Sequence, residues 1–161
     1  MGLYFEDLAV GRVNDLGSHT FGRAEIIDFA RKFDPQPFHL SDEGAIGTLF
    51  GALCASGWHT TAIWLRLVVD NRRRLADQMR FQGTRPAQYG PSPGFEAIRW
   101  IKPVYPGDTI RYQSTVKDLV PSKSRPTVGL LVSDNTGHNQ TGDLVFSIRG
   151  KIFVERRIPV A

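Results

Sequence analysis

The chain has 161 residues, of which 41% are hydrophobic and 22% are charged, and its 20 Lys and Arg against 16 Asp and Glu give a formal net charge of +4. A chain of this length buries about two-thirds of its unfolded surface in one domain, so we expect residues 1–161 to form a single domain. Its one cysteine, Cys54, excludes an internal disulfide framework and a several-cysteine metal site, and fits a reducing, cytoplasmic compartment. We expect no metal and no resident cofactor.

Membrane and nucleic-acid partners are not expected. No apolar run approaches the roughly 18–20 residues that a helix needs to cross a bilayer, and the first seven residues lack the order of a secretory signal. Much of the basic excess lies between Arg72 and Arg85, where a solvated helix end explains it better than a nucleic-acid surface. The basic residues also do not alternate with aromatic residues in a stripe.

The first part of the chain favours short helices over strands. Residues 10–21 predict one irregular strand, and apolar residues at helical spacing from Ile26 to Phe33 predict an amphipathic helix. Two prolines follow, so that helix must end at residue 33 or 34, and we expect residues 34–38 to be stiff and non-helical.

The middle of the chain predicts a short helix, a longer buried helix and a loop. Ser41 is a candidate N-cap for a helix over residues 42–47. Apolar residues on most sides predict a buried helix from residue 57 to about residue 69, with the arginines at 72–74 at its C-terminal end. Prolines and glycines then mark residues 83–94 as a loop.

The last 67 residues predict four consecutive strands separated by turn residues. The strands are expected at residues 95–104, 109–120, 127–135 and 144–156. A largely apolar helix followed by an antiparallel meander does not suit a parallel doubly wound fold. We therefore expect an α+β domain in which the antiparallel sheet curls around the buried helix.

Asp34 and His39 lie five residues apart on a segment that two prolines stiffen. A carboxylate and an imidazole can act as general acid and base if both reach the same water within about 2.6–3.2 Å, and a rigid segment can hold that geometry. Spacing alone favours a structural interpretation, in which Asp34 caps a turn and His39 is a hydrogen-bonded interior residue.

Gly57 begins the buried helix between Ser56 and Trp58. The first amides of a helix have no partner within it and can bind an oxyanion, and a glycine lets a ligand approach the backbone. A structural interpretation is also open, with Ser56 as the N-cap, Gly57 as a packing residue and His59 in a structural role. Cys54 lies in an apolar run and is expected to be a small core residue, not a nucleophile.

Residues 33–40, 55–60 and 99–108 together resemble the MaoC-like dehydratases and (R)-specific enoyl-CoA hydratases of the hotdog fold, and residues 122–126 follow in the expected order. The Asp-x-x-x-x-His spacing is the specific element of this resemblance. Thioesterases of the same fold usually place a catalytic carboxylate or a different group on or near the central helix. The resemblance implies an antiparallel sheet wrapped around a mostly buried central helix.

The resemblance implies that Asp34 and His39 form a catalytic dyad and that the Gly57 amide binds the thioester oxygen. The implied reaction adds water across C2–C3 of an enoyl thioester, or removes it from a (R)-3-hydroxyacyl thioester. Ser56 and Trp58 are expected to contact the substrate. Which member of the dyad is the base, and the length of the acyl chain, stay open.

The resemblance also implies a homodimer that binds an acyl-CoA or an acyl-carrier thioester, with coenzyme A present only as part of the substrate. Lys123, Arg125 and the arginines at 72–74 are candidates to meet the phosphates of the carrier. Two features depart from the family: Leu65 stands where many members have a small hydroxyl residue, and the loop over residues 81–95 is long. A hotdog thioesterase and a non-catalytic acyl-thioester-binding subunit remain alternatives.

Overall fold

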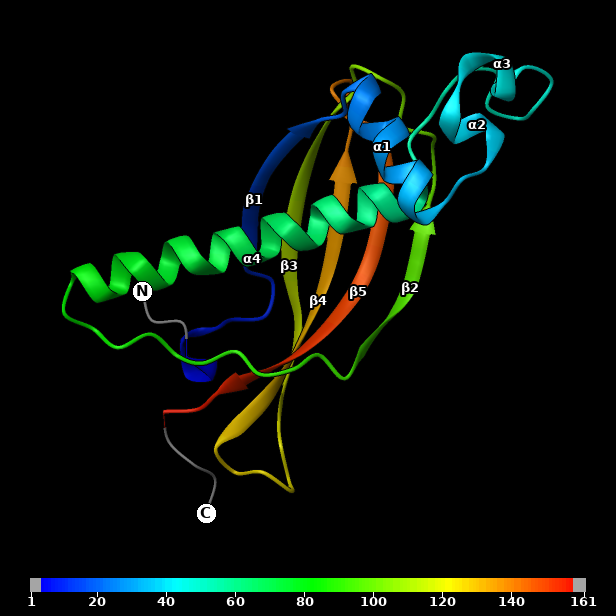
Figure 1. Ribbon diagram of the computed structural model, residues 1–161. Coiled ribbons are helices and arrows are strands. Elements are labelled where there is room, and N and C mark those ends of the chain that lie inside the picture. Colours follow the sequence, from blue (N-terminus) through cyan, green and yellow to red (C-terminus); the bar gives the residue numbers. More distant parts are fainter. Residues whose placement is uncertain (1–3, 158–161) are drawn as a thin grey trace.

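The computed structural model describes residues 4–157, which contain a five-stranded sheet with a long helix, α4 (Gly57–Phe81), across one face (Figure 1). The strands lie in the order β1-β3-β4-β5-β2, and every neighbouring pair is antiparallel. Their bounds are Val13–Thr20 (β1), Gly94–Trp100 (β2), Thr109–Pro121 (β3), Val128–His138 (β4) and Leu144–Glu155 (β5). The predicted α+β class and meander are confirmed.

Two strands differ from the prediction at their ends. β2 stops at Trp100, although we expected it to continue to residue 104, because Pro103 has no amide to donate to the neighbouring strand. β4 continues to His138 and pairs with both β3 and β5 over most of its length. The central three strands therefore form the most extensive part of the sheet.

Three short helices carry the chain from β1 to α4: α1 (Arg23–Phe33), α2 (Pro37–Leu40) and α3 (Asp42–Ala45). α1 ends where the prolines predict. The expectation that the stiff segment stays non-helical to residue 38 is wrong, because Pro37 occupies the first position of α2, where its fixed φ suits a helix. Ser41 caps α3 as predicted and accepts a hydrogen bond from the Gly44 amide at 3.0 Å. In Figure 1, α2 and α3 project beyond the end of the sheet.

The predicted end of the long helix near residue 69 is wrong, since α4 continues to Phe81. Arginine is a good helix former, and Leu75 and Met79 extend the apolar stripe of the helix onto Ala87 of the following loop. Gly83, with φ +72°, then occupies the left-handed position that commonly follows a helix end. Residues 82–93 form the predicted loop.

The core lies between the sheet and one side of α4. Phe21, Tyr112 and Phe146 are fully buried there, and Trp64 and Val68 of α4 pack against them. The expectation that α4 is buried on most sides is wrong within one chain, because a single sheet covers only one side of the helix. No helix in residues 4–157 is long and apolar enough to cross a membrane.

Candidate active site

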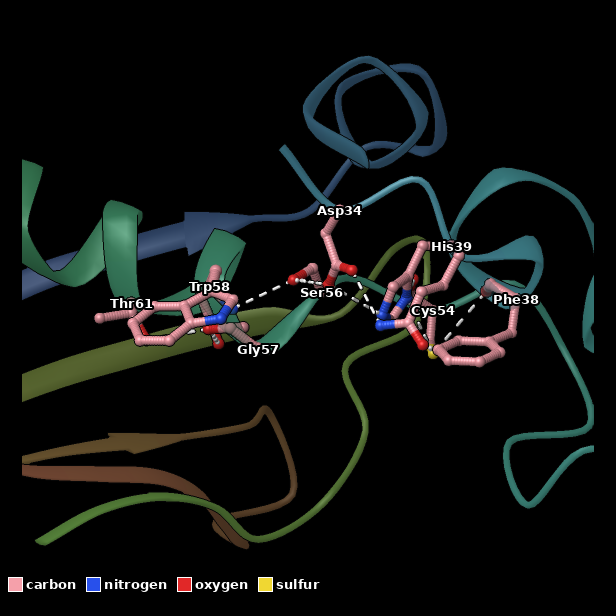
Figure 2. A network of polar contacts seen from close by, with 10 residues as sticks. Asp34, Phe38, His39, Cys54, Ser56, Gly57, Trp58 and Thr61 are labelled. Atoms are coloured by element: carbon pink, nitrogen blue, oxygen red, sulfur yellow. Dashed lines mark hydrogen bonds and ion pairs between the residues drawn. The ribbon is translucent and has the colours of Figure 1, made fainter. Parts of the chain in front are cut away.

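The structure brings Asp34 and His39 together at the base of the projecting helices (Figure 2). Asp34 follows the last residue of α1, His39 lies in α2, and Asp34 Oδ2 is 3.5 Å from His39 Nε2. Their side chains are 18% and 7% exposed, respectively. The two groups are therefore close enough to share a proton or a water, and largely shielded from bulk solvent.

The orientation of His39 is set by the backbone of a distant segment. His39 Nδ1 lies 2.7 Å from the carbonyl oxygen of Cys54, and because a carbonyl only accepts, Nδ1 carries the proton and donates. The Cys54 amide in turn donates to the Phe38 carbonyl at 3.2 Å, which ties this segment to α2. Nε2 is thus the nitrogen presented to Asp34, and the one that can gain or lose a proton.

Asp34 is held in its ionised form by hydrogen bonds. Ser56 Oγ donates to Oδ2 at 2.6 Å, and Gln36 Nε2 donates to Oδ1 at 2.8 Å. Burial alone raises the pKa of Asp34, but the hydrogen bonds from Ser56 and Gln36 and the charge of His39 together hold this pKa below its ordinary value. Gln36 was not predicted as a site residue, because nothing in the spacing distinguishes it from a turn residue.

Ser56 links the dyad to the start of α4. Besides donating to Asp34, its hydroxyl accepts a hydrogen bond from the Trp58 amide at 3.1 Å and caps the helix. The N-cap interpretation of Ser56 is confirmed, and the same hydroxyl also contacts the dyad, whereas its contact with substrate stays a prediction. The Gly57 amide lies at the first position of α4, and among residues 4–157 no acceptor contacts it.

Gly57 also has the packing role that the structural interpretation offered, although the sequence did not identify its partner. A Cβ at this position would clash with the indole ring of Trp100 in β2. Trp100 Nε1 donates to Thr61 Oγ1 at 3.1 Å, and Thr61 Oγ1 donates to the Gly57 carbonyl at 2.9 Å. Trp58, half-exposed, meets Trp100 edge to face with ring centroids 5.0 Å apart. The glycine is thus required by a neighbouring side chain, whatever approaches its amide.

A cavity of about 840 Å³ runs between α4 and the sheet. Phe33, which precedes Asp34, and Trp58, which follows Gly57, line its near end. Leu65 lines it as well. This volume lies within the range of ligand pockets in proteins, so the cavity has room for a sizeable organic group. Asp34, His39 and Gly57 are not among its lining residues, but Phe33 and Trp58 are their neighbours in the chain.

Cys54 and His59 are also buried, and their contacts fit structural roles. Burial raises the pKa of the Cys54 thiol to about 11, so the thiol is protonated at neutral pH and is a poor nucleophile. His59 stacks on Phe29 with ring centroids 4.5 Å apart, and burial lowers its pKa. The predicted core position of Cys54 and the structural role of His59 agree with these contacts.

A family model for the MaoC like domain matches residues 9–135. The chain belongs to this family. The solved MaoC-like dehydratase from Rhodospirillum rubrum is 39% identical and superposes with a TM-score of 0.80, over 99% of this chain and 100% of that one. The (R)-hydratase from A. caviae has a TM-score of 0.61 at 23% identity, over 94% of this chain and 98% of that one, and shares the hotdog fold.

Named relatives of this MaoC-like chain include enzymes that act on CoA thioesters. The 3-hydroxybutyryl-CoA dehydratase of Methylorubrum extorquens is 28% identical over 128 residues, which cover 76% of this chain and 69% of that protein. An uncharacterized protein of Bacillus subtilis, YdeM, is 27% identical over 151 residues, which cover 94% of this chain and 98% of that protein.

Two predicted substrate contacts of the MaoC-like chain lie away from the dyad. Lys123 and Arg125 are in the connection between β3 and β4, at the end of the sheet opposite α2 and α3 (Figure 1). The Arg125 guanidinium lies over the Phe153 ring, 4.4 Å from its centroid. One chain does not bring these residues to Asp34, and their role as phosphate contacts stays a prediction.

Proposed function

We propose that this MaoC-like chain catalyses the reversible addition of water to the C2–C3 double bond of a trans-2-enoyl thioester, which gives a (R)-3-hydroxyacyl thioester. One observation carries the proposal. Asp34 Oδ2 and His39 Nε2 face each other at 3.5 Å, each fixed by separate hydrogen bonds, near the Gly57 amide, which has no acceptor within residues 4–157. Coenzyme A, or another carrier, enters only as part of the substrate.

The two members of the dyad take different parts in this reaction. Because its pKa is held low, Asp34 is ionised and accepts a proton from the attacking water, whose oxygen bonds to C3. His39 gives its Nε2 proton to C2, and its Nδ1 proton stays hydrogen-bonded to the Cys54 carbonyl. Proton transfer from Asp34 to His39 across their contact then restores the starting state.

The Gly57 amide stabilises the negative charge that develops on the thioester oxygen. Attack at C3 shifts negative charge onto the thioester oxygen, and a donor already in place stabilises this charge without reorganisation. The amide lies at the N-terminus of a 25-residue helix, where the positive end of the helix dipole adds to the effect. Uncharged Cys54 takes no covalent part.

We also propose that the working unit is a cytoplasmic homodimer. β2 is an edge strand of the sheet, and Phe95 and Trp100 on it are about half-exposed, as are Trp58 and Leu65 at the start of α4. An apolar surface of this kind beside an open strand edge commonly marks an interface. Sedimentation analysis should give twice the mass of the chain, and a monomer at micromolar concentration would contradict the proposal.

The test of the reaction uses three readouts on one incubation. Purified protein is mixed with a panel of enoyl-CoA thioesters, and the loss of enoyl absorbance, the chirality of the product and the release of free thiol are followed. We expect loss of absorbance, an (R)-product and no thiol. Thiol release would indicate a thioesterase instead, and binding without any conversion would indicate a non-catalytic acyl-thioester-binding subunit.

A further inference from the structure

The cavity beside the dyad continues far along α4. On the helix side its lining runs from Trp58 to Leu75, and because an α-helix rises 1.5 Å per residue this stretch is about 25 Å long. At its near end the lining includes Phe33 and Trp58, which are next to Asp34 and Gly57 in the chain. An acyl chain that extends from the reaction centre past Phe33 and Trp58 would enter this cavity, between the helix and the sheet.

The middle of the cavity combines apolar walls with unsatisfied polarity. Val68 of α4 and Leu131 of β4 are among its apolar lining residues. Trp64, also in the lining, is nine-tenths buried, and its indole Nε1 has no hydrogen-bond partner in the described part of the chain. A buried donor without an acceptor is costly, so an oxygen of a ligand or a water would stabilise this region.

The far end of the cavity is cationic. Arg72 and Arg12 line it, and neither forms an ion pair with a carboxylate in residues 4–157. Arg72 Cζ lies 4.7 Å from the centroid of the Tyr89 ring, and burial lowers the pKa of Arg72. Burial raises the pKa of Tyr89, whereas the charges of Arg72 and Arg12 both lower it, so the two guanidinium groups lie near the same hydroxyl.

Within residues 4–157, no carboxylate forms an ion pair with Arg72 or Arg12. Asp7 also lies near Tyr89, but both of its carboxylate oxygens accept hydrogen bonds from the Arg157 guanidinium, at 3.1 and 2.8 Å. Most other arginines that are not fully exposed have such a partner; Arg149, for example, binds Asp134 at 2.6 Å. A guanidinium that is largely buried without a counter-charge is unfavourable unless a ligand supplies one.

We propose that the preferred substrate is an ω-carboxyacyl thioester, whose distal carboxylate is bound by Arg72 and Arg12 at the far end of this cavity. The inference rests on the proposed hydratase function and names the substrate class of the same site. Carboxylates pair well with the fork of donors on a guanidinium. The phosphates of the carrier are the other anions of such a substrate, but they lie on the opposite side of the thioester from the acyl chain.

The test compares two substrates of equal length that differ only at the distal end. These are trans-2-dodecenoyl-CoA and trans-2-dodecenedioyl-CoA, in which a carboxylate replaces the terminal methyl group. We expect the unaltered protein to prefer the dicarboxylic substrate by at least about tenfold in kcat/KM, which is the usual size of a hydrogen bond to a charged group. Arg72→Met should abolish this preference, and Arg72→Lys should retain part of it.

Arg73→Met is the matched control. Arg73 is the next residue of α4, is exposed and does not line the cavity, so its replacement should leave the ratio of the two kcat/KM values unchanged. Equal kcat/KM values for the two substrates in the unaltered protein would overturn the inference. An equal loss for both substrates in Arg72→Met and Arg72→Lys would do the same, since it would assign Arg72 a purely structural role.

Two further measurements separate the possible failures. The saturated dodecanedioyl-CoA cannot be hydrated, so its binding by calorimetry reports on Arg72 even if the protein has no hydratase activity. Arg72-dependent binding without turnover would reject the proposed function and keep this inference. The N-acetylcysteamine thioesters of the two enoyl acids contain no phosphate and provide the last comparison. Suppose that Arg72→Met lowers kcat/KM only for CoA thioesters, and equally with and without the distal carboxylate. The arginines then bind carrier phosphate, and the inference fails.

Discussion

The dyad and the far end of the cavity treat their charged groups in opposite ways. Around the dyad the protein supplies the partners: Ser56 and Gln36 bind Asp34, and the Cys54 carbonyl binds His39. At the far end Arg72 has an aromatic ring beside it and no carboxylate of the described chain. The proposed reaction requires Asp34 and His39 to keep one geometry, which the protein pre-organises. The proposed substrate class instead supplies the counter-charge that Arg72 lacks in residues 4–157.

The largest effect is expected from substitutions of Asp34 and His39. Asp34→Asn keeps the shape of the side chain but cannot accept a proton from water, and His39→Ala removes the acid. Each should reduce the hydration of crotonyl-CoA by about 10²–10⁴-fold, measured by enoyl absorbance. The circular dichroism spectrum should be unchanged.

Asp28→Asn provides the control for that loss. Asp28 lies on the exposed side of α1, 3.8 Å from Arg31, and does not belong to the site. Its replacement should leave turnover within about twofold of the unaltered chain, as surface substitutions usually do. Full activity in either dyad variant would remove Asp34 and His39 from the mechanism.

The packing of Trp100 on Gly57 predicts the next effect. In Gly57→Ala the new methyl group meets the indole ring, and overpacking of this kind costs about 1–3 kcal/mol of unfolding free energy. Urea denaturation measures this loss. Replacing Trp100 with leucine in the same chain should recover part of it, because the smaller side chain leaves room for the methyl. If the double variant is no more stable than Gly57→Ala alone, the indole is not the cause.

Ser56→Ala tests how far one hydrogen bond controls the dyad. Losing the donor to Asp34 should raise the carboxyl pKa toward its ordinary value, so the acid limb of the kcat/KM profile should move to higher pH. The sign follows because Asp34 acts as a base, and activity is lost as pH falls through its pKa. The helix should also lose a cap, which costs about 0.5–2 kcal/mol.

Ser41→Ala separates those two effects of Ser56. Ser41 caps α3 through the Gly44 amide and does not touch Asp34, so its loss should lower stability without moving the pH profile. If both serine variants shift the acid limb equally, the shift reflects general destabilisation and not the bond to Asp34.

The sequence predicted the pairing of Asp34 and His39 better than it predicted what surrounds the pair. Asp34 and His39 are five residues apart on a proline-stiffened segment, so local sequence constrains their separation. Apart from Gln36, the groups that bind the pair come from far away: Ser56 is 22 residues from Asp34, and Cys54 is 15 residues from His39. Such contacts depend on tertiary packing, which has no local pattern.

The predicted length of α4 was wrong for the same reason. The arginines at 72–74 are typical of a helix end, but Leu75 and Met79 pack on residues of the following loop and carry the helix further. That error concealed the position of Arg72, which lies inside the cavity lining and not at a solvated helix end. Trp100 is the last residue of the edge strand β2 and is far from Gly57 in the chain. The sequence therefore gave no local signal of the contact that requires the glycine.

The smallest expected effect concerns Cys54, whose carbonyl serves the dyad while its thiol does not. With a pKa of about 11, about one thiol in a thousand is ionised at pH 8, so iodoacetamide should label the folded protein far more slowly than the urea-unfolded chain. Mass spectrometry of timed samples measures both rates. Fast labelling of the folded protein with parallel loss of hydration would show an activated thiol beside His39, 3.7 Å away, and would reopen a covalent mechanism. Slow labelling would support a role for the Cys54 carbonyl in orienting the imidazole and no role for the thiol.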